Sequence, residues 1–591
     1  MVRVVRVHRA SEEILVEAIS HALDAESATS GTVLTREFLE RVPAGRSYQQ
    51  AVQLVSGVSG IGGQAVPGAG VRNEATYLLD GVSISDPVTG TFSLSLPLGA
   101  VEQVDILTSG QMPEHPGAVG PVVALSGATG TNNLRAEVGV HHLVRLQGPG
   151  TADTVTAGVS GPIVRDRVWL HASAESAGST HPTSDAVSRV GMVALTAQPT
   201  PGHRLTLRAL GDAVETVDVD GGLRPAGGGV TGRWQWFVSP TTNVDSRASV
   251  QGRAVAGDAW ERQVAASTVS LVGVDDPLGG THDLKAGAAA ERTGWRLGGE
   301  WAQAWLGVPV PAVSETAVGS MFAQDSWRLG SVVWAGGVRV DGTLGRPWAS
   351  PRLSIGWDPS GRGRSRLLLG AARSWGHLGL ATLAIAPEQG LSRLDSAFAA
   401  AEWELIEDVA VIGRATLRDR SGLPTVGGGR VDQTSWSTEL RLTKIDSRRW
   451  FGELAWTHTG LLVPSDRTLV DDGSLIGFSD AIIGSASWAL PTDPWTQTLD
   501  VLASAHLGPL GTVVSDPTAG VRSTARWTAG ARFTQDIDLR RGKLHIDLEA
   551  RHVVLLDDPV APTRLLRLQG AVPDTVAWQG PRIEAGLRYG F

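Results

Sequence analysis

The chain ends on the stretch Arg582-Ile583-Glu584-Ala585-Gly586-Leu587-Arg588-Tyr589-Gly590-Phe591. Its apolar side chains alternate strictly with charged residues or glycine. Because successive side chains of a strand point to opposite faces, this alternation predicts a strand with one apolar and one polar face. Closed barrels of outer membranes commonly finish on such a strand, since closure leaves no unpaired backbone edge in lipid. Leu587, Tyr589 and Phe591 are therefore the candidate barrel-closing signal.

The composition narrows the possible classes of protein. The chain has 591 residues, of which 42% are hydrophobic and 19% charged, with 73 Gly and no Cys. No apolar run approaches the roughly 18 residues of a helical membrane span, so a membrane form must cross as strands. The net charge of −9 argues against a nucleic-acid binder, which needs a basic surface.

Alternating segments fill the chain beyond about residue 131, whereas residues 15–130 are rich in loops. Residues 524–533 and 543–551 both alternate and are joined by a short connection, which predicts a β-hairpin. One face of the second strand carries Lys543, His545, Asp547, Glu549 and Arg551, a row that requires water. A wide barrel supplies an aqueous lumen. At roughly 21 residues per strand and connection, residues 131–591 give about 22 strands, the number typical of a plugged barrel.

Tryptophan is abundant, with 20 residues in the chain. Its ring suits the two membrane interfaces, where an apolar body and a wet N–H are both satisfied. We expect interfacial girdles to include Trp327, Trp334, Trp357, Trp375, Trp456 and Trp527.

A family resemblance lies first in the amino-terminal part. Residues 34–43 and 53–58 resemble the start of the plug domain of TonB-dependent outer-membrane receptors. Residues 72–82 and the following Asp86-Pro87-Val88-Thr89-Gly90 are similar to the central plug strand and turn of that family, and residues 100–107 and 122–127 to its later plug strands. The plug motif is carried by Arg72, Asn73, Tyr77, Asp80, Gly81 and Asp86.

The resemblance continues into the barrel region. Residues 161–169 are similar to the second-strand signature of the subgroup related to carboxypeptidase-regulatory-domain-containing receptors. Residues 280–287, 322–327 and 350–353 also resemble barrel segments of the family. The resemblance implies an all-β membrane protein: an antiparallel transmembrane barrel of about 22 strands with an amino-terminal α+β plug in its lumen. The implied domains are an amino-terminal segment at 1–30, a plug at 31–130 and a barrel at 131–591.

The sequence departs from the family pattern at two places. Members commonly have Arg-Gly ahead of the central plug strand, where this chain has Gly70-Val71-Arg72-Asn73. They also tend to have an aromatic-Gly-Arg turn, where this chain has Glu114-His115-Pro116-Gly117-Ala118. The usual polar latch between plug and barrel is therefore not expected from these residues.

The segment ahead of the plug is the candidate coupling peptide. Receptors of this family carry there a TonB box, a short extended peptide that adds to a strand of the energising protein. The matching residues are Glu12, Glu13, Ile14, Leu15, Val16, Glu17 and Ala18. The same residues could instead begin a helix that continues to Leu23. Residues 1–25 lack a central apolar block, so no secretory signal is visible. Three explanations stay open: a truncated or misassigned start, which is the most economical, a signal that was left out, or a cytosolic protein.

Enzymatic and metal sites find little support in the sequence. Residues 60–65 loosely fit a dinucleotide fingerprint, but Pro67 and Gly68 follow where a helix should begin. His141 and His142 are adjacent and would face opposite sides of a strand. Asp536 and Asp538 share a face, as carboxylates of a calcium site would, although solvation by a lumen or loop is the simpler interpretation. We expect no catalytic residue, metal or cofactor.

The resemblance implies a monomeric receptor in the bacterial outer membrane that imports a scarce ligand when its plug rearranges. Its implied partners are TonB with the inner-membrane energising complex, the outer-membrane assembly machinery, membrane lipid and lipopolysaccharide, and an unidentified ligand, with no nucleic acid. Two alternatives stay open: a barrel of the same fold that acts in adhesion or surface assembly, and a soluble β-rich carbohydrate-active protein. The sequence does not identify the ligand, because specificity lies in loops that share no code.

Overall fold

The computed structural model describes residues 28–43, 47–52, 55, 58–59, 66–67, 75–85, 94–116, 120–147, 149–181, 184–218, 226–256, 259–276, 280–297, 312–343, 346–377, 391–406, 408–424, 430–447, 450–462, 477–491, 496–508, 524–556 and 580–591. Among these residues, no helix has the length and apolar character needed to span a membrane.

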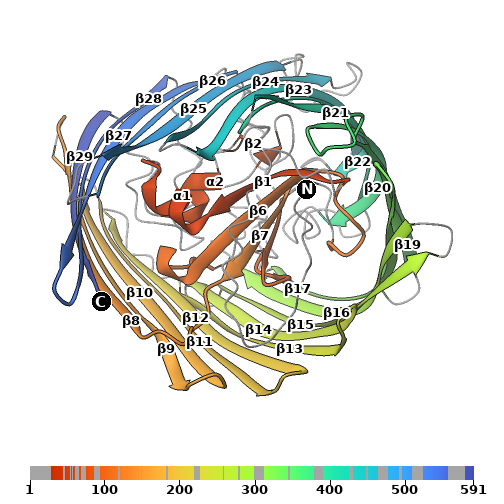
Figure 1. The fold of residues 1–591 in the computed structure, drawn as a ribbon, viewed down its shortest axis with the longest axis horizontal. Helices are drawn as coiled ribbons and strands as arrows, with labels where there is room; N and C mark the ends of the chain where they lie inside the picture. Colours follow the sequence, from red (N-terminus) through yellow and green to blue (C-terminus); the bar gives the residue numbers. More distant parts are fainter. Residues whose placement is uncertain are drawn as a thin grey trace.

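A closed antiparallel barrel of 22 strands surrounds a small mixed sheet, as Figure 1 shows, which confirms the predicted fold class. Each barrel strand pairs with its neighbours in sequence, and the last strand pairs with the first. The barrel strands are β8 (Arg135–Arg145), β9 (Thr151–Val164), β10 (Val168–His181), β11 (Ser184–Thr200), β12 (His203–Asp218), β13 (Ala226–Ser239), β14 (Thr242–Ala256), β15 (Ala259–Asp276), β16 (Gly280–Leu297), β17 (Ala312–Leu329), β18 (Val332–Thr343), β19 (Arg346–Trp357), β20 (Ser365–His377), β21 (Leu391–Ile406), β22 (Val409–Pro424), β23 (Arg430–Ser447), β24 (Trp450–Leu462), β25 (Gly477–Pro491), β26 (Thr496–Gly508), β27 (Thr524–Leu539), β28 (Gly542–Leu556) and β29 (Gly580–Gly590).

The carboxy-terminal strand closes the barrel. In the β29–β8 ladder, Leu587 lies opposite Val140. Beyond β29, the N–H and carbonyl of Phe591 exchange hydrogen bonds of 2.9 and 2.8 Å with the backbone of Ala136. Closure therefore satisfies the backbone of both terminal strands, as a barrel in lipid requires.

Alternation along the strands separates a lumenal from an outer face. In the hairpin of β27 and β28, Leu548 is 52% exposed, whereas its neighbour Glu549 is 1% exposed and faces Arg532 across the ladder. The predicted row from Lys543 to Arg551 lies on this inner face. Trp334, Trp357, Trp456 and Trp527 are 42, 47, 41 and 53% exposed on the outer face, as expected for interfacial rings.

The two ends of the barrel differ in the length of their connections. Connections such as 330–331, 240–241 and 540–541 join strands at the end that also carries Phe591. Most connections at the opposite end are longer in sequence, up to residues 557–579, although 182–183, 257–258 and 344–345 are equally short.

The plug lies inside the barrel wall, drawn in red and orange in Figure 1. Its main sheet has the order β1-β6-β7-β4-β5, in which β4 and β7 are parallel. The plug elements are β1 (Ser30–Thr35), α1 (Arg36–Arg41), α2 (Tyr48–Val52), β2 (Val58–Ser59), β3 (Val66–Pro67), β4 (Thr76–Leu79), β5 (Val82–Ser83), the 3-10 helix η1 (Leu98–Ala100), β6 (Val101–Ser109) and β7 (Val122–Gly127).

Local chemistry explains the entry into α1, and burial holds the plug together. The Thr35 side chain accepts a hydrogen bond of 3.3 Å from the N–H of Phe38, which caps the helix. Tyr48, Tyr77, Ile106 and other apolar residues of the plug form one buried cluster, which also includes Met192 and Leu210 of the barrel. The apolar core of the plug thus extends into the wall at this one place, and two smaller apolar contacts join Ala28 and Met112 to β18 and Val42 to β26. Between these patches the plug and the wall meet through polar side chains.

Candidate functional site: the interface between plug and barrel

The first polar contact joins the β4–β5 turn of the plug to β12. Asp80 and Gly81 form this turn with φ angles of 49° and 79°. The Asp80 carboxylate accepts hydrogen bonds from the Arg208 guanidinium and from the N–H of Gly127. Arg208, which is 3% exposed, also donates to the Gly127 carbonyl at 2.7 Å. One buried arginine of the wall therefore links two ends of plug strands.

Gly81 is favoured by its backbone, whose φ is positive, and it also leaves room for the Arg247 guanidinium, which would otherwise have to move. A Cβ atom at this position would lie 2.1 Å from a guanidinium nitrogen of Arg247 on β14. Further along β14, Gln251 donates a hydrogen bond of 2.9 Å to the Ser83 carbonyl of the plug. Only glycine lets the turn approach β14 this closely without strain at positive φ.

The second contact involves residues 111–115, which follow β6. Arg352 of β19 donates to the Met112 carbonyl at 2.8 Å, and Arg339 of β18 donates to the Pro113 carbonyl at 3.4 Å. The Glu114 carboxylate accepts from Lys285 at 2.9 Å, and Gln324 bonds both its carboxylate and its N–H. The plug–barrel latch that the sequence departure left unexpected is thus present, with a carboxylate on the plug and cations on the wall.

Burial and charge set the protonation of this segment. Burial raises the pKa of Glu114, but the Lys285 ammonium, His115 and the hydrogen bonds from Lys285 and Gln324 together outweigh it and hold the pKa below its ordinary value. Burial, together with the nearby cations Arg352, Lys285 and Arg339, lowers the pKa of His115 from 6.5 to about 4 against the opposing effect of Glu114. At neutral pH this segment therefore carries a carboxylate next to a neutral imidazole.

A third contact holds the edge of the plug sheet. Arg414 of β22 donates to the Thr108 hydroxyl at 2.6 Å and to the Ser30 hydroxyl, while it pairs with Glu439 of the wall at 3.0 Å. Arg441 of β23 donates to the Thr32 hydroxyl at 2.7 Å. Strands β1 and β6 are therefore attached to the wall through neutral acceptors.

A fourth contact anchors helix α1. Glu40 accepts from Arg588 of β29 at 2.8 Å and from Arg36 of its own helix at 3.0 Å. Burial raises the pKa of Glu40, but Arg588 and then Arg36 outweigh this effect and lower it overall. Arg41 lies 3.4 Å from Asp500, and Arg532 donates to the Glu40 carbonyl. The alternation in the sequence predicts only that Arg588 faces the lumen; the structure shows that it also anchors the plug.

A polar cavity of about 390 Å³ adjoins this anchorage. It lies between α1 with η1 and the wall formed by β8–β10 and β25–β29. Carboxylates contributed by Glu137, Glu175, Asp536 and Asp547 line it, together with Arg532 and Arg588. A cavity with a charged lining therefore reaches the plug on the side where α1 is held.

These contacts share one chemical character. In most of them, arginines, a lysine or a glutamine of the barrel donate to carboxylates, hydroxyls and carbonyls of the plug. The pair of Arg41 on the plug with Asp500 on the wall has the opposite polarity. Charge-assisted hydrogen bonds are directional and strong in a dry environment, but water can replace each of them when the interface opens. This arrangement holds the plug in one position without merging it with the wall.

The predicted site residues fall into three groups. Asp80 and Gly81 lie at the interface, and Tyr77 is 1% exposed in the plug core. Leu587 and Phe591 are 46 and 60% exposed on the outer face of the closing strand, where the Tyr589 hydroxyl donates to the Arg541 carbonyl at 3.0 Å. The coupling-peptide candidates and Arg72, Asn73 and Asp86 lie outside the described residues.

The pairs His141 with His142 and Asp536 with Asp538, considered above as possible metal ligands, interact with neighbouring side chains of the barrel. His141 is 5% exposed on the lumenal side near Asp547 and Glu584, whereas His142 bonds Asp153 on the outer side at 2.7 Å. Asp536 bonds His545, and in the part of the chain that the structure describes no group of three metal-ligating side chains comes together. Sequence reasoning missed Arg208, Lys285, Arg352 and Arg588 as plug contacts; their only signal is a charge on the lumenal parity of a strand.

Comparisons with known proteins agree with this architecture. No family model matches the chain. In sequence, it is 27% identical over 207 residues to the TonB-dependent transporter Oar of Myxococcus xanthus, a match that covers 29% of this chain and 19% of that protein. In structure, it superimposes on the siderophore receptor PirA from Pseudomonas aeruginosa with a TM-score of 0.71 at 12% identity, covering 95% of this chain and 99% of that one. The chain has the fold of the TonB-dependent receptors.

Two further structures of this TonB-receptor fold extend the comparison. The ferric citrate transporter FecA matches with a TM-score of 0.70 at 11% identity, covering 96% of this chain and 97% of that one. The outer membrane transporter YddB from Escherichia coli gives 0.68 at 11% identity, covering 98% and 100%. The proteins named here are receptors and transporters rather than enzymes. The sequence match to Oar spans about a fifth of the length of that protein.

Proposed function

We propose that this protein is an energy-coupled receptor that imports a scarce ligand across the bacterial outer membrane by rearrangement of its plug. The observation that carries the proposal is a folded plug inside the barrel, held by directional polar contacts that include Asp80 with Arg208 and Glu114 with Lys285. A static lumenal filling would be favoured by continuous apolar packing with the wall, which buries area without needing to be reversed.

The proposed orientation rests on the lengths of the connections at the two ends of the barrel, and the proposed domain limits rest on the family resemblance. Short connections lie on the periplasmic side of bacterial barrels and long ones outside, so the end with Phe591 would face the periplasm. The amino-terminal segment 1–30 would carry the coupling peptide at 12–18, residues 31–130 the plug and residues 131–591 the barrel. TonB and its inner-membrane complex would supply the pull, and the assembly machinery would recognise the strand that carries Leu587, Tyr589 and Phe591.

The test is ligand accumulation in cells that make the full chain behind an export signal. Compounds that co-purify with the protein are first identified by mass spectrometry and then supplied in labelled form. Labelled ferric citrate and ferric enterobactin serve as additional probes, because two structurally similar proteins are a ferric citrate transporter and a ferric enterobactin receptor. We expect at least one compound to bind the cell surface and to accumulate only while the proton-motive force is intact.

Two outcomes would contradict the proposal. Accumulation that persists at the same rate after a protonophore would indicate a passive pore. Surface binding without accumulation in energised cells would favour the adhesion or surface-assembly alternative.

A further inference from the structure

A chain of hydrogen bonds runs along the lumenal wall from β16 to β14 and ends on the plug. The NH2 group of Gln251 on β14 donates to the Ser83 carbonyl of β5 at 2.9 Å and to the side-chain carbonyl of Gln263 on β15. The NH2 group of Gln263 donates to the Glu291 carboxylate of β16 at 2.6 Å, and the Thr293 hydroxyl donates to the same oxygen at 3.1 Å. Side chains of β14, β15 and β16 thus act together on one carbonyl of the plug.

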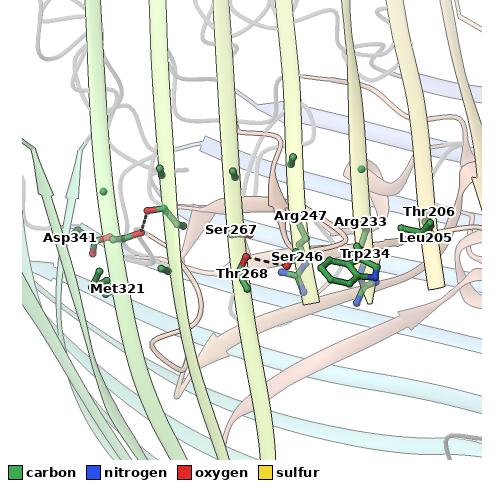
Figure 2. Close-up of a pocket in the computed structure, with 18 of the residues that line it drawn as sticks. Leu205, Thr206, Arg233, Trp234, Ser246, Arg247, Ser267, Thr268, Met321 and Asp341 are labelled. Atoms are coloured by element: carbon green, nitrogen blue, oxygen red, sulfur yellow. Dashed lines mark hydrogen bonds between the residues drawn. The ribbon is translucent and has the colours of Figure 1, made fainter. Parts of the chain in front are cut away.

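Alternation along the strands places this chain on the lumenal face. Arg247 of β14 shares the parity of Gln251 and reaches the β4–β5 turn of the plug. Side chains of the other parity point outward, such as Ser246 of β14 and Thr268 of β15, which are hydrogen-bonded to each other at 3.1 Å (Figure 2). The chain of hydrogen bonds therefore lies between the wall and the plug, away from the membrane.

Burial makes the geometry of this chain strict. Gln251 is 8% and Gln263 4% exposed, and the ladder places them directly opposite each other. Buried amides without partners cost free energy, so both side chains are expected to keep their hydrogen bonds. The Glu291 carboxylate only accepts, so it fixes the NH2 group of Gln263 toward β16 and turns the Gln263 carbonyl toward Gln251. Gln251 then presents its NH2 group, and not its carbonyl, to the plug.

Glu291 is the member of the chain that contents of the lumen can reach. It is half-buried, and it lies in the half of β16 nearer the connection 298–311. A group in the lumen that donates a hydrogen bond to Glu291 would compete with Gln263 for the carboxylate. Gln263 would then be free to rotate, and the Ser83 carbonyl would lose the donor that holds it.

We propose that Gln263 and Glu291 are positioning residues that hold Gln251 against the plug, and that a hydrogen-bond donor at Glu291 loosens the β4–β5 turn. A ligand that acts in this way carries an ammonium, guanidinium or hydroxyl group. Its part in import rests on the proposed function, whereas the hold on Ser83 does not. The same turn carries Asp80, so its release would also weaken the contact with Arg208.

The experiment measures how often the β4–β5 turn opens in the full-length protein in detergent, with no ligand present. The chain has no cysteine and Val82 is 7% exposed, so Val82→Cys supplies a single thiol whose labelling by a maleimide reports opening. In this background, Gln263→Glu sets two carboxylates side by side and removes the donor to Glu291. Combining Gln263→Glu with Glu291→Gln exchanges the two residues, so the same hydrogen bonds can form with the same net charge.

A matched control and a second pair of variants complete the set. Ser249→Ala changes a buried neighbour on β14 whose hydroxyl has no hydrogen-bond partner in the described part of the chain. Ala265 of β15 lies directly opposite Glu291 on the lumenal face, so Ala265→Lys brings an ammonium group to the carboxylate without any ligand. Ala265→Met adds a side chain of similar length without a donor. Heat-modifiable migration on gels checks that every variant is folded.

We expect Gln263→Glu to be labelled at least about fivefold faster than the parental protein, because a hydrogen bond to the plug is lost. The exchanged pair should return to the parental rate, Ser249→Ala should keep that rate, and Ala265→Lys should be labelled faster than Ala265→Met. Parental labelling of Gln263→Glu, or an exchanged pair as fast as Gln263→Glu, would overturn the positioning role. Equal rates for the two Ala265 variants would overturn the effect of a donor at Glu291. These rates are measured without transport, so their failure is distinct from a failure of the proposed import.

Discussion

The contact between Asp80 and Arg208 makes the most quantitative prediction about the plug. In Asp80→Ala, the guanidinium of Arg208 would keep its hydrogen bond to the Gly127 carbonyl but lose its ion pair with the Asp80 carboxylate. Its side chain is 4% exposed, so water reaches it poorly. Removing one member of a buried ion pair costs about 3–5 kcal/mol, because the remaining charge stays buried without its counter-charge.

That magnitude corresponds to a roughly hundredfold to several-thousandfold higher population of the opened plug. A matched control exists in the plug itself. Glu37 pairs with Arg41 one helical turn away at 2.9 Å, but its side chain is 70% exposed. Glu37→Ala should therefore cost only about 0.3–0.5 kcal/mol. The two variants remove the same kind of pair and differ chiefly in burial.

The assay uses the absence of cysteine from the chain. Ala51 is 2% exposed in the plug core, so Ala51→Cys introduces a single thiol that reacts with a maleimide only when the plug opens. The ratio of its reaction rate to that of a free thiol gives the free energy of opening, while gel mobility confirms that the barrel remains closed. If Asp80→Ala accelerates labelling no more than Glu37→Ala does, the interface is not held by its buried charges.

Three further predictions concern the closing strand, the pH response and the coupling peptide. Leu587→Arg should destabilise the assembled barrel by about 2 kcal/mol because it places a charge on the lipid face. Arg588→Leu should leave the barrel closed and remove only the ion pair from the wall to Glu40, which keeps its bond to Arg36. Normal assembly of the first variant with failure of the second would contradict the assigned faces. Because the folded pKa of His115 is about 4 against 6.5 when unfolded, the unfolded plug binds more protons between these values, so plug stability should fall as pH drops from 6.5 to 4. The lowered pKa of Glu114 also makes plug stability fall as the pH drops, at lower pH values. In the Ala51→Cys labelling assay, His115→Gln should weaken the dependence of thiol protection on pH between 6.5 and 4. An unchanged dependence would exclude His115 as its source. Leu15→Pro or Val16→Pro should retain surface binding of the ligand but stop its accumulation, because strand addition needs backbone N–H groups. Val16→Ile should have almost no effect. If the proline variants accumulate ligand at the parental rate, residues 12–18 are not the coupling peptide.

Alternation in the sequence was sufficient to predict the barrel and some of its parts. The β27–β28 hairpin and the faces of the closing strand follow from parity alone, since a strand has a period of two. The plug was recognised by resemblance, and its motif contains Asp80 and Gly81, which do lie at the interface. Local chemistry dictates these features, so local sequence reveals them.

The partners across the interface could not be predicted in the same way. Asp80 and Arg208 are 128 residues apart, and parity tells only that Arg208 faces the lumen. Which plug group it meets depends on the position of the whole plug in the barrel. The contact at Glu114 was obscured further, because the family commonly has a different turn there.

A cross-link between plug and barrel tests most directly whether the plug is a moving gate. A Cβ atom at Gly530 of β27 would lie 3.3 Å from the Cβ of Pro43, which follows α1, and a Cβ atom at Gly99 of η1 would lie 3.6 Å from the Cβ of Ser173 of β10. Both values are close to the separation in disulfides. Cells carrying Pro43→Cys with Gly530→Cys, or Gly99→Cys with Ser173→Cys, are compared oxidised and reduced for surface binding and accumulation of the ligand. The account predicts that oxidation stops accumulation, preserves binding and is reversed by a reductant. Accumulation at the parental rate with both cross-links formed would contradict it.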